Sequence, residues 1–148
     1  MDILNSIEWY IHASPKTAVM KETHEFITEE QLETVVFDST VGKKVNLSLP
    51  LNDEFLFTKK KSLSTPVTVR KLLTTIYKFY REKLDAADCD KAFEDMEEWK
   101  EEIVETKYDG DCTKLIKYDV FTDTCTPDFC GLEYNENTDS FFVCIGPE

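Results

Sequence analysis

The cysteines are the side chains of this sequence whose chemistry depends most on spacing. Cys112, Cys125, Cys130 and Cys144 follow one another as C-x12-C-x4-C-x13-C. Structural zinc needs four thiolates or imidazoles, which usually come as two close pairs, and only Cys125 and Cys130 are close here. Their spacing also differs from the C-x-x-C of thioredoxin-like redox proteins. The pattern favours ordinary buried or loop thiols. Zinc binding, or a redox or disulfide role for Cys125 and Cys130, remains as an alternative.

Histidines and phosphate-binding loops offer little further chemistry. His12 and His24 are the only histidines, and neither stands in a spacing typical of a metal site or a catalytic triad. Asp109-Gly110-Asp111 lacks the ligand pattern of an EF-hand loop. The four glycines form no glycine-rich phosphate loop. We therefore predict no cofactor, no metal ion and no enzyme activity.

Carboxylates form the densest cluster of charged groups. Five glutamates line one side of a predicted helix, and these are Glu97, Glu98, Glu101, Glu102 and Glu105. Carboxylates act as acids or bases, or bind divalent cations, where they converge in a cleft. A stripe along a helix is more often a solvated face. If the stripe has a binding role, we predict that these five glutamates contact a protein partner.

Charge is also sorted into blocks along the whole chain. Residues 59–83 carry eight Lys or Arg and one acid, whereas residues 84–111 carry twelve Asp or Glu and three Lys. The net charge of −13 argues against direct binding to nucleic acid or to anionic membranes. The first residues lack the basic start of a signal peptide, and no apolar run reaches the roughly 18–20 residues of a membrane span. We predict a cytoplasmic protein with reduced thiols.

We predict that the helices and strands that position these side chains belong to one compact domain over residues 1–148. The chain is long enough to bury a core, and 41% of its residues are hydrophobic. The predicted fold class is α+β, with an N-terminal β hairpin region, a central antiparallel helix pair and a C-terminal antiparallel β meander. Residues 1–14 fit either a short helix capped by Asp2 or a strand. Thr28-Glu29-Glu30-Gln31 has the form of a capping box.

Alternating apolar residues predict the N-terminal hairpin. Residues 34–38 and 43–49 flank Ser39–Gly42, where Gly42 supplies the freedom for a turn. Residues 55–57 predict a further short strand. At the other end of the chain, strand-like patterns over 115–121, 131–134 and 141–145 predict the meander. The last of these is apolar on both sides, so we expect it to be central or well covered.

Two helices are predicted between these β regions. Residues 68–84 form a broad apolar stripe that opens at the N-cap Thr68. A second helix from about Asp90 buries Phe93, Met96, Trp99 and Ile103. Because the joint between the helices is short, we expect an antiparallel hairpin held partly by its opposite charges. Reversing Glu98 and Glu101 to Lys should then cost about 1 kcal/mol. We favour this structural reading of the charge blocks over docking of a partner.

Three stretches carry a resemblance. They are Pro66–Tyr80 (PVTVRKLLTTIYKFY), Tyr108–Asp111 (YDGD), and Gly131-Leu132 with the closing apolar strand Phe142–Gly146. Over residues 66–146 this order resembles small uncharacterised proteins encoded by large DNA viruses of amoebae and algae. The resemblance transfers no catalytic residue. It implies an intracellular protein made in an infected host, with packaging into the virion left open.

Three functions follow as hypotheses. Segregated charge, abundant aromatic residues and missing catalytic motifs favour a non-enzymatic protein-interaction module. The alternative from another class is an acidic decoy that mimics nucleic acid and binds a basic DNA-binding protein through the glutamate stripe. The third is a small zinc or redox protein built on the C-terminal cysteines.

Overall fold

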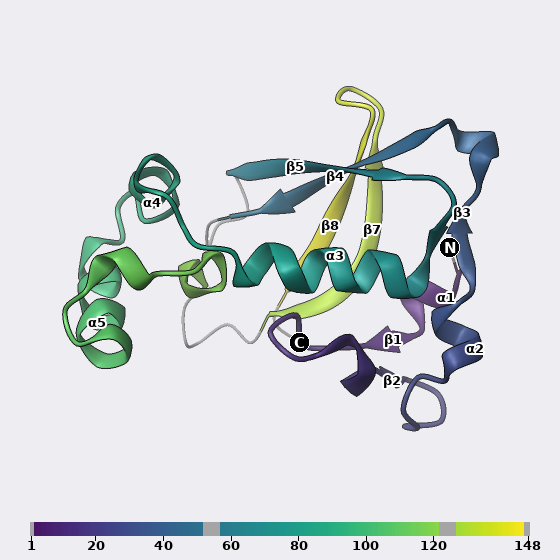
Figure 1. Cartoon of the computed structure of the whole chain (residues 1–148), viewed down its shortest axis with the longest axis horizontal. Coiled ribbons are helices and arrows are strands. Elements are labelled where there is room, and N and C mark those ends of the chain that lie inside the picture. The colour runs from purple at the N-terminus through teal and green to yellow at the C-terminus, as the bar shows by residue number, and fades with distance from the viewer. Residues whose placement is uncertain (1, 52–56, 122–126, 147–148) are drawn as a thin grey trace.

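The computed structural model describes residues 2–51, 57–121 and 127–146, and it confirms the α+β class (Figure 1). The α-helices are α1 (Asp2–Asn5), α2 (Glu29–Leu32), α3 (Val69–Arg81), α4 (Ala86–Ala92) and α5 (Glu97–Tyr108). The strands are β1 (Ile7–Glu8), β2 (Val19–Met20), β3 (Val35–Phe37), β4 (Lys44–Pro50), β5 (Thr58–Ser64), β6 (Val67–Thr68), β7 (Asp128–Asn135) and β8 (Ser140–Gly146). Short 3-10 helices are η1 (Pro15–Thr17), η2 (Ser39–Val41), η3 (Cys112–Lys114) and η4 (Lys117–Val120).

The main sheet has the strand order β5-β4-β8-β7. Its pairs are antiparallel except β4 and β8, which run parallel with Leu47 opposite Phe141. The expectation that the last strand is central is confirmed, because β8 lies between β4 and β7. A buried hydrogen bond of 2.9 Å between the Ser48 and Ser140 hydroxyls joins β4 to β8. The sheet therefore brings the N-terminal and C-terminal halves of the chain together.

Helix α3 lies across one face of this sheet (Figure 1). Thr68 caps it as predicted, because its side chain accepts a hydrogen bond from the Lys71 amide. The predicted apolar stripe is buried, and its members within the helix are Val69, Leu72, Leu73, Ile76, Phe79 and Tyr80. The Tyr80 hydroxyl donates to the Pro50 carbonyl at 2.6 Å, and burial raises the pKa of this phenol. The helix is thus tied to the end of β4.

The N-terminal region contains both of the elements that residues 1–14 suggested. Helix α1 is followed by β1, which pairs antiparallel with β2. The capping box predicted at Thr28 is confirmed, since Thr28 and Gln31 each bond the other's backbone amide. These short elements bring Glu29 and Glu33 close to the start of α3.

The hairpin predicted around Ser39–Gly42 is wrong, although both of its strands exist. β3 pairs with β6, while β4 pairs with β5. The reason is local, because the Asp38 side chain accepts the Thr40 amide and starts η2 in place of a tight hairpin turn. The short strand predicted at 55–57 falls mainly on residues outside the described part of the chain.

The second predicted helix differs from the expectation. It is interrupted between α4 and α5, where Asp95 adopts a left-handed backbone with a φ of 62°. Phe93 and Ile103 are buried as expected, whereas Met96 and Trp99 are half-buried. Both helices lie beyond the C-terminal end of α3 and not alongside it (Figure 1). The break lets the chain turn away from α3, so the predicted side-by-side packing does not form.

The C-terminal region confirms two of the three predicted strands. β7 and β8 form an antiparallel pair joined by a turn in which Asp139 has a φ of 48°. The stretch 115–121 is not a strand, because Asp119 accepts the Ile116 amide and folds the chain into η4. Among the residues described, no helix is long and apolar enough to cross a membrane.

Candidate functional site

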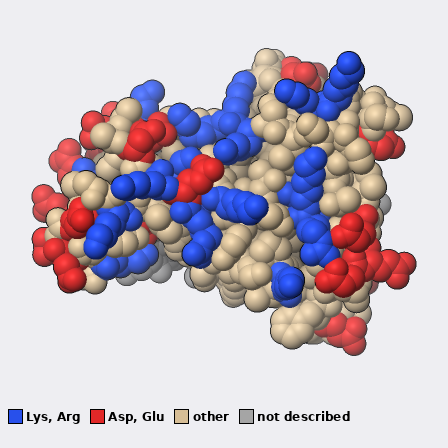
Figure 2. All heavy atoms as spheres, viewed as in Figure 1, with Lys and Arg blue, Asp and Glu red and all other residues tan. Residues whose placement is uncertain are grey.

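The five predicted glutamates lie on α5, within a segment that we call the acidic lobe (residues 85–111). All five are exposed. The residues of α5 buried in the core are Ile103 and Val104, which occupy one narrow side of the helix. Figure 2 shows basic side chains across the middle of one face of the molecule and acidic side chains concentrated toward its two ends. The sorting of charge along the sequence thus becomes a sorting in space.

The predicted ion pairs between α3 and this lobe do not form. None of the ion pairs in the described part of the chain uses any acid between residues 94 and 105. The expectation that opposite charges hold two antiparallel helices together is therefore wrong. Its physical reason is the break at Asp95, which directs α5 away from α3.

The cations of the basic block pair with other acids instead. Arg70 binds Glu33, with a distance of 2.7 Å from Nε to Oε1, and also binds Glu29. Glu82 lies between Lys61 and Lys117, with Nζ to carboxylate distances of 3.4 and 2.5 Å. Partial burial opposes ionisation of Glu82, but the hydrogen bond and charge of Lys117, with those of Lys61, lower its pKa. These pairs join α3 to its neighbours and leave the α5 acids without an internal partner among the described residues.

One buried carboxylate anchors the lobe to the rest of the protein. The Asp119 side chain is 1% exposed and accepts hydrogen bonds from Lys107 Nζ at 2.6 Å, Tyr108 Oη at 2.5 Å and the Ile116 amide at 2.9 Å. Burial, and then the bond to Asp119, raises the pKa of Tyr108. Asp119 thus holds the C-terminal end of α5 against η4, because it satisfies donors from both elements.

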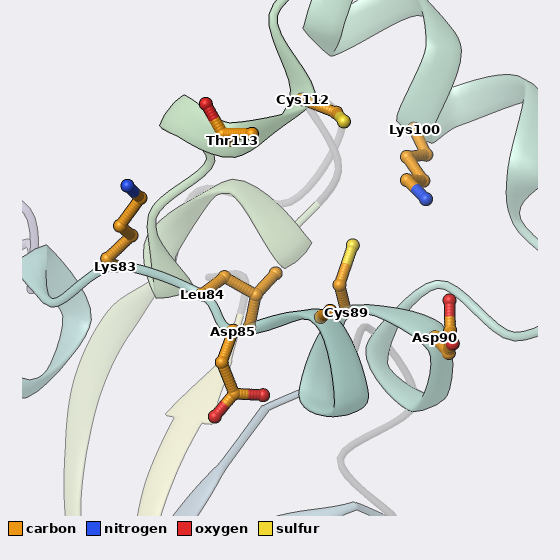
Figure 3. A pocket seen from close by; sticks show the side chains of 9 residues that line it. Lys83, Leu84, Asp85, Cys89, Asp90, Lys100, Cys112 and Thr113 are labelled. Atoms are coloured by element: carbon orange, nitrogen blue, oxygen red, sulfur yellow. The ribbon is translucent and has the colours of Figure 1, made fainter.

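A pocket with a volume of about 340 Å³ lies between the acidic lobe and the end of α3. Its lining residues come from the α3–α4 joint, α4, α5 and η3, and they are Lys83, Leu84, Asp85, Ala86, Cys89, Asp90, Lys100, Cys112 and Thr113. Figure 3 shows the Cys89 and Cys112 thiols directed into the same space, which the Lys100 side chain enters from α5. We call this cavity the thiol pocket.

The electrostatics of the thiol pocket act on Cys89 in two directions. Burial raises the pKa of the Cys89 thiol, and the neighbouring Asp90 and Cys112 raise it further. The charge of Lys100 and its hydrogen bonding to the thiol act against this rise. Cys89 is 8% exposed, whereas Cys112 is exposed. The pocket therefore presents one accessible thiol and one sheltered thiol beside a cation.

The other predicted cysteines lie elsewhere. Cys130 on β7 is exposed and Cys144 on β8 is half-buried. Burial raises the pKa of the Cys144 thiol, and Glu133 and Cys130 add to this rise. Cys125 lies outside the described residues, so the predicted relation between Cys125 and Cys130 stays a prediction. In the described ranges, no three His, Cys, Asp or Glu side chains are grouped so that they could hold a metal ion.

The two histidines are not part of the thiol pocket. His12 is exposed, and its ring lies 5.1 Å from that of Tyr118 and 5.9 Å from that of Tyr10, measured between centroids. His24 is exposed in a turn with a φ of 58°. Neither lines the pocket beside Cys89 or Cys112, so the thiol pocket provides no Cys–His nucleophile pair.

Comparisons of this chain with protein-family models, with curated proteins and with solved structures find no match. The candidate site therefore stands on its own geometry.

Sequence reasoning identified the α5 glutamates and Cys112 but missed Cys89 and Lys100. Cys89 is separated from Cys112 along the chain by the whole of α5, so no local spacing joins the two. Its one sequence signal is a small apolar residue within an acidic stretch, a pattern that indicates a helix contacting the core. That signal does not indicate which other residue the thiol faces.

Proposed function

We propose that this protein is a non-enzymatic protein-interaction module whose exposed α5 face docks onto a basic surface of a partner protein. The observation that carries the proposal is the exposure of five glutamates that take part in no ion pair within the described chain. They are Glu97, Glu98, Glu101, Glu102 and Glu105.

The energetics of α5 support this function. Glutamates three and four positions apart repel each other by about 0.2–0.5 kcal/mol per pair on an isolated helix. Glu101 has neighbours of like charge at both spacings, in Glu97, Glu98 and Glu105. Among the described residues no cation pairs with them to offset this repulsion. A basic partner surface would supply the missing positive charge and speed association by electrostatic steering.

The wider setting of the proposal follows from charge. With a net charge of −13 the chain as a whole repels nucleic acid and anionic membranes, so a protein is the partner we propose. We propose that it acts in the cytoplasm, or in the host cell interior or the virion if the resemblance to viral proteins reflects its origin.

The test compares two variants of equal net charge as bait. The first converts the five α5 glutamates to Gln. The second converts five exposed acids elsewhere on the surface that form no ion pair among the described residues, namely Glu22, Glu25, Glu30, Glu133 and Glu136. A protein bound by the native chain should be lost from the first variant and kept by the second. Equal binding to both variants, or no bound protein at several salt concentrations, would contradict the proposal.

Charge density favours an acidic decoy as the second candidate. Residues 97–105 place five carboxylates along roughly 12 Å of helix, since each residue rises about 1.5 Å. This axial spacing of about 3 Å per carboxylate approaches the roughly 3.4 Å of helix axis per phosphate in one DNA strand. The partner would then be a DNA-binding protein, and DNA should compete for the same basic groove.

Competition with DNA distinguishes the two candidates, because both depend on charge and both should weaken as salt rises. Double-stranded DNA should displace a partner captured by a decoy. Binding that DNA does not displace would exclude the decoy and leave the general interaction module.

A further inference from the structure

The thiol pocket brings together two cysteines that no local spacing relates. Cys89 lies on α4, and Cys112 is the first residue of η3. Figure 3 shows both thiols directed into the same cavity. Cys112 also adds to the rise in the pKa of the Cys89 thiol. The segment between these two cysteines contains all of α5, and it begins and ends at the pocket.

We propose that Cys89 and Cys112 form a redox-active dithiol pair, which a low-molecular-weight disulfide such as glutathione disulfide oxidises to a disulfide across the pocket. This modification site does not depend on the proposed interaction function. It also differs from the Cys125 and Cys130 pair that the sequence suggested.

Exposure sets the order of the two thiols. Cys112 is exposed and can meet a dissolved disulfide, whereas Cys89 is 8% exposed and lies beneath it in the pocket. Cys112 loses its proton to solvent and its thiolate attacks one sulfur of glutathione disulfide. The sulfur–sulfur bond of that molecule breaks, and one glutathione leaves as a thiolate that takes up a proton.

The second step closes the pocket. Cys89 loses its proton, and its thiolate attacks the Cys112 sulfur of the mixed disulfide. The bond between Cys112 and glutathione breaks, the Cys89–Cys112 bond forms, and the second glutathione leaves and is protonated. The two cysteines are oxidised by two electrons, while glutathione disulfide is reduced to two glutathione molecules.

Lys100 assists the second step. The thiolate and not the thiol is the nucleophile, and burial disfavours the thiolate of Cys89. Lys100 enters the pocket from α5 and stabilises that thiolate, while Asp90 on α4 opposes it. Lys83 and Asp85 line the same pocket from the α3–α4 joint. Removing the Lys100 charge should therefore move the pH profile of disulfide closure to higher pH.

Closure would have a direct structural consequence. The Cys89–Cys112 disulfide would join the two ends of the segment that contains α5, and therefore every glutamate of the α5 face. A cross-link restricts the unfolded chain within the loop that it closes. The acidic lobe would then be held against local opening in the oxidised form of the protein.

The test uses the full reduced protein, incubated with glutathione disulfide and then digested without reduction. We expect a mass loss of two hydrogens and a peptide pair that links Cys89 to Cys112. A lasting glutathione adduct on Cys112 without this link, or oxidation confined to other cysteines, would overturn the proposal.

Variants identify the roles of the individual residues. Cys89→Ser and Cys89→Ala should both stop at the glutathione adduct on Cys112, whereas Cys130→Ser and Cys144→Ser should still form the link. Lys100→Met should shift the pH profile of closure upward, and the matched control Lys83→Met should not. An unchanged profile in Lys100→Met, or an equal shift in Lys83→Met, would contradict the role of Lys100.

Discussion

Charge has opposite roles in two regions of the molecule. One is the body, which is formed by α3 and the main sheet, and the other is the acidic lobe. In the body, Arg70 and Glu82 each contact two side chains of opposite charge, and six residues of α3 are buried. In the lobe, α5 buries two residues and exposes its glutamates without internal ion pairs in the described chain. The difference indicates that charge supports folding in the body, whereas the glutamates of α5 add no ion pair to the described fold.

Packing should show the largest contrast between the two regions. Ile76 on α3 is 0% exposed, and Ile76→Ala should cost about 3–4 kcal/mol of unfolding free energy, since it leaves a cavity in a dense core. Ile103 on α5 is 5% exposed, and Ile103→Ala should cost about 2 kcal/mol because the thinner lobe can settle around the gap. Urea denaturation measures both. An equal or larger loss for Ile103→Ala would mean that the lobe is packed as tightly as the body.

Removing the anchor between the regions should have the next largest effect. Asp119→Asn should cost about 2–3 kcal/mol, because it removes the buried charge that Lys107 and Tyr108 both contact. Hydrogen exchange should accelerate in α5 more than in α3. Asp109→Asn is the control, since Asp109 is exposed in a left-handed conformation that Asn tolerates. Uniform acceleration across both helices would show that Asp119 supports the whole fold and not the lobe.

A smaller, pH-dependent effect should come from the body's paired charges. The lowered pKa of Glu82 means that its ion pairs stabilise the protein above the ordinary glutamate range and lose this effect as the pH falls through the folded-state pKa. Glu82→Gln should lower the melting temperature slightly at pH 7. The loss of unfolding free energy should be less than about 1 kcal/mol, because the Glu82 side chain is 42% exposed. Below the folded-state pKa of Glu82 the variant and the native protein should melt alike, since the carboxylate is then protonated. A loss that does not shrink as the pH is lowered would indicate lost packing and not lost charge.

The sequence predicted those parts of the fold that depend on local patterns. The Thr68 cap and the buried stripe of α3 follow from helical periodicity, and the central position of β8 follows from its apolar character on both sides. The pairing of β3 with β6 could not be predicted, because the Asp38 cap that redirects the chain after β3 resembles an ordinary turn residue. The break at Asp95 was also hidden, since the surrounding acidic sequence continues to fit a helix.

The candidate site was predictable to a different extent in each of its parts. The glutamates of α5 could be found because residues on one helix face have a fixed spacing. The thiol pocket could not, because Cys89, Lys100 and Cys112 meet only after the chain turns back at the end of α5. A relation of this kind depends on tertiary structure, for which the spacing of residues along the chain carries no signal.

The most direct test of the contrast is a thermal melt of Glu101→Gln, Glu102→Gln and Glu105→Gln combined, at low and at high salt. We expect the melting temperature to rise at low salt, because each relieved pair of like charges should add a few tenths of a kcal/mol to the unfolding free energy. This gain should shrink at high salt. The matched control combines Glu22→Gln, Glu25→Gln and Glu136→Gln, which changes net charge equally at exposed sites. It should gain less than the α5 variant. A fall in the melting temperature of the α5 variant at low salt would show that its acids hold the molecule together, and would contradict their availability to a partner.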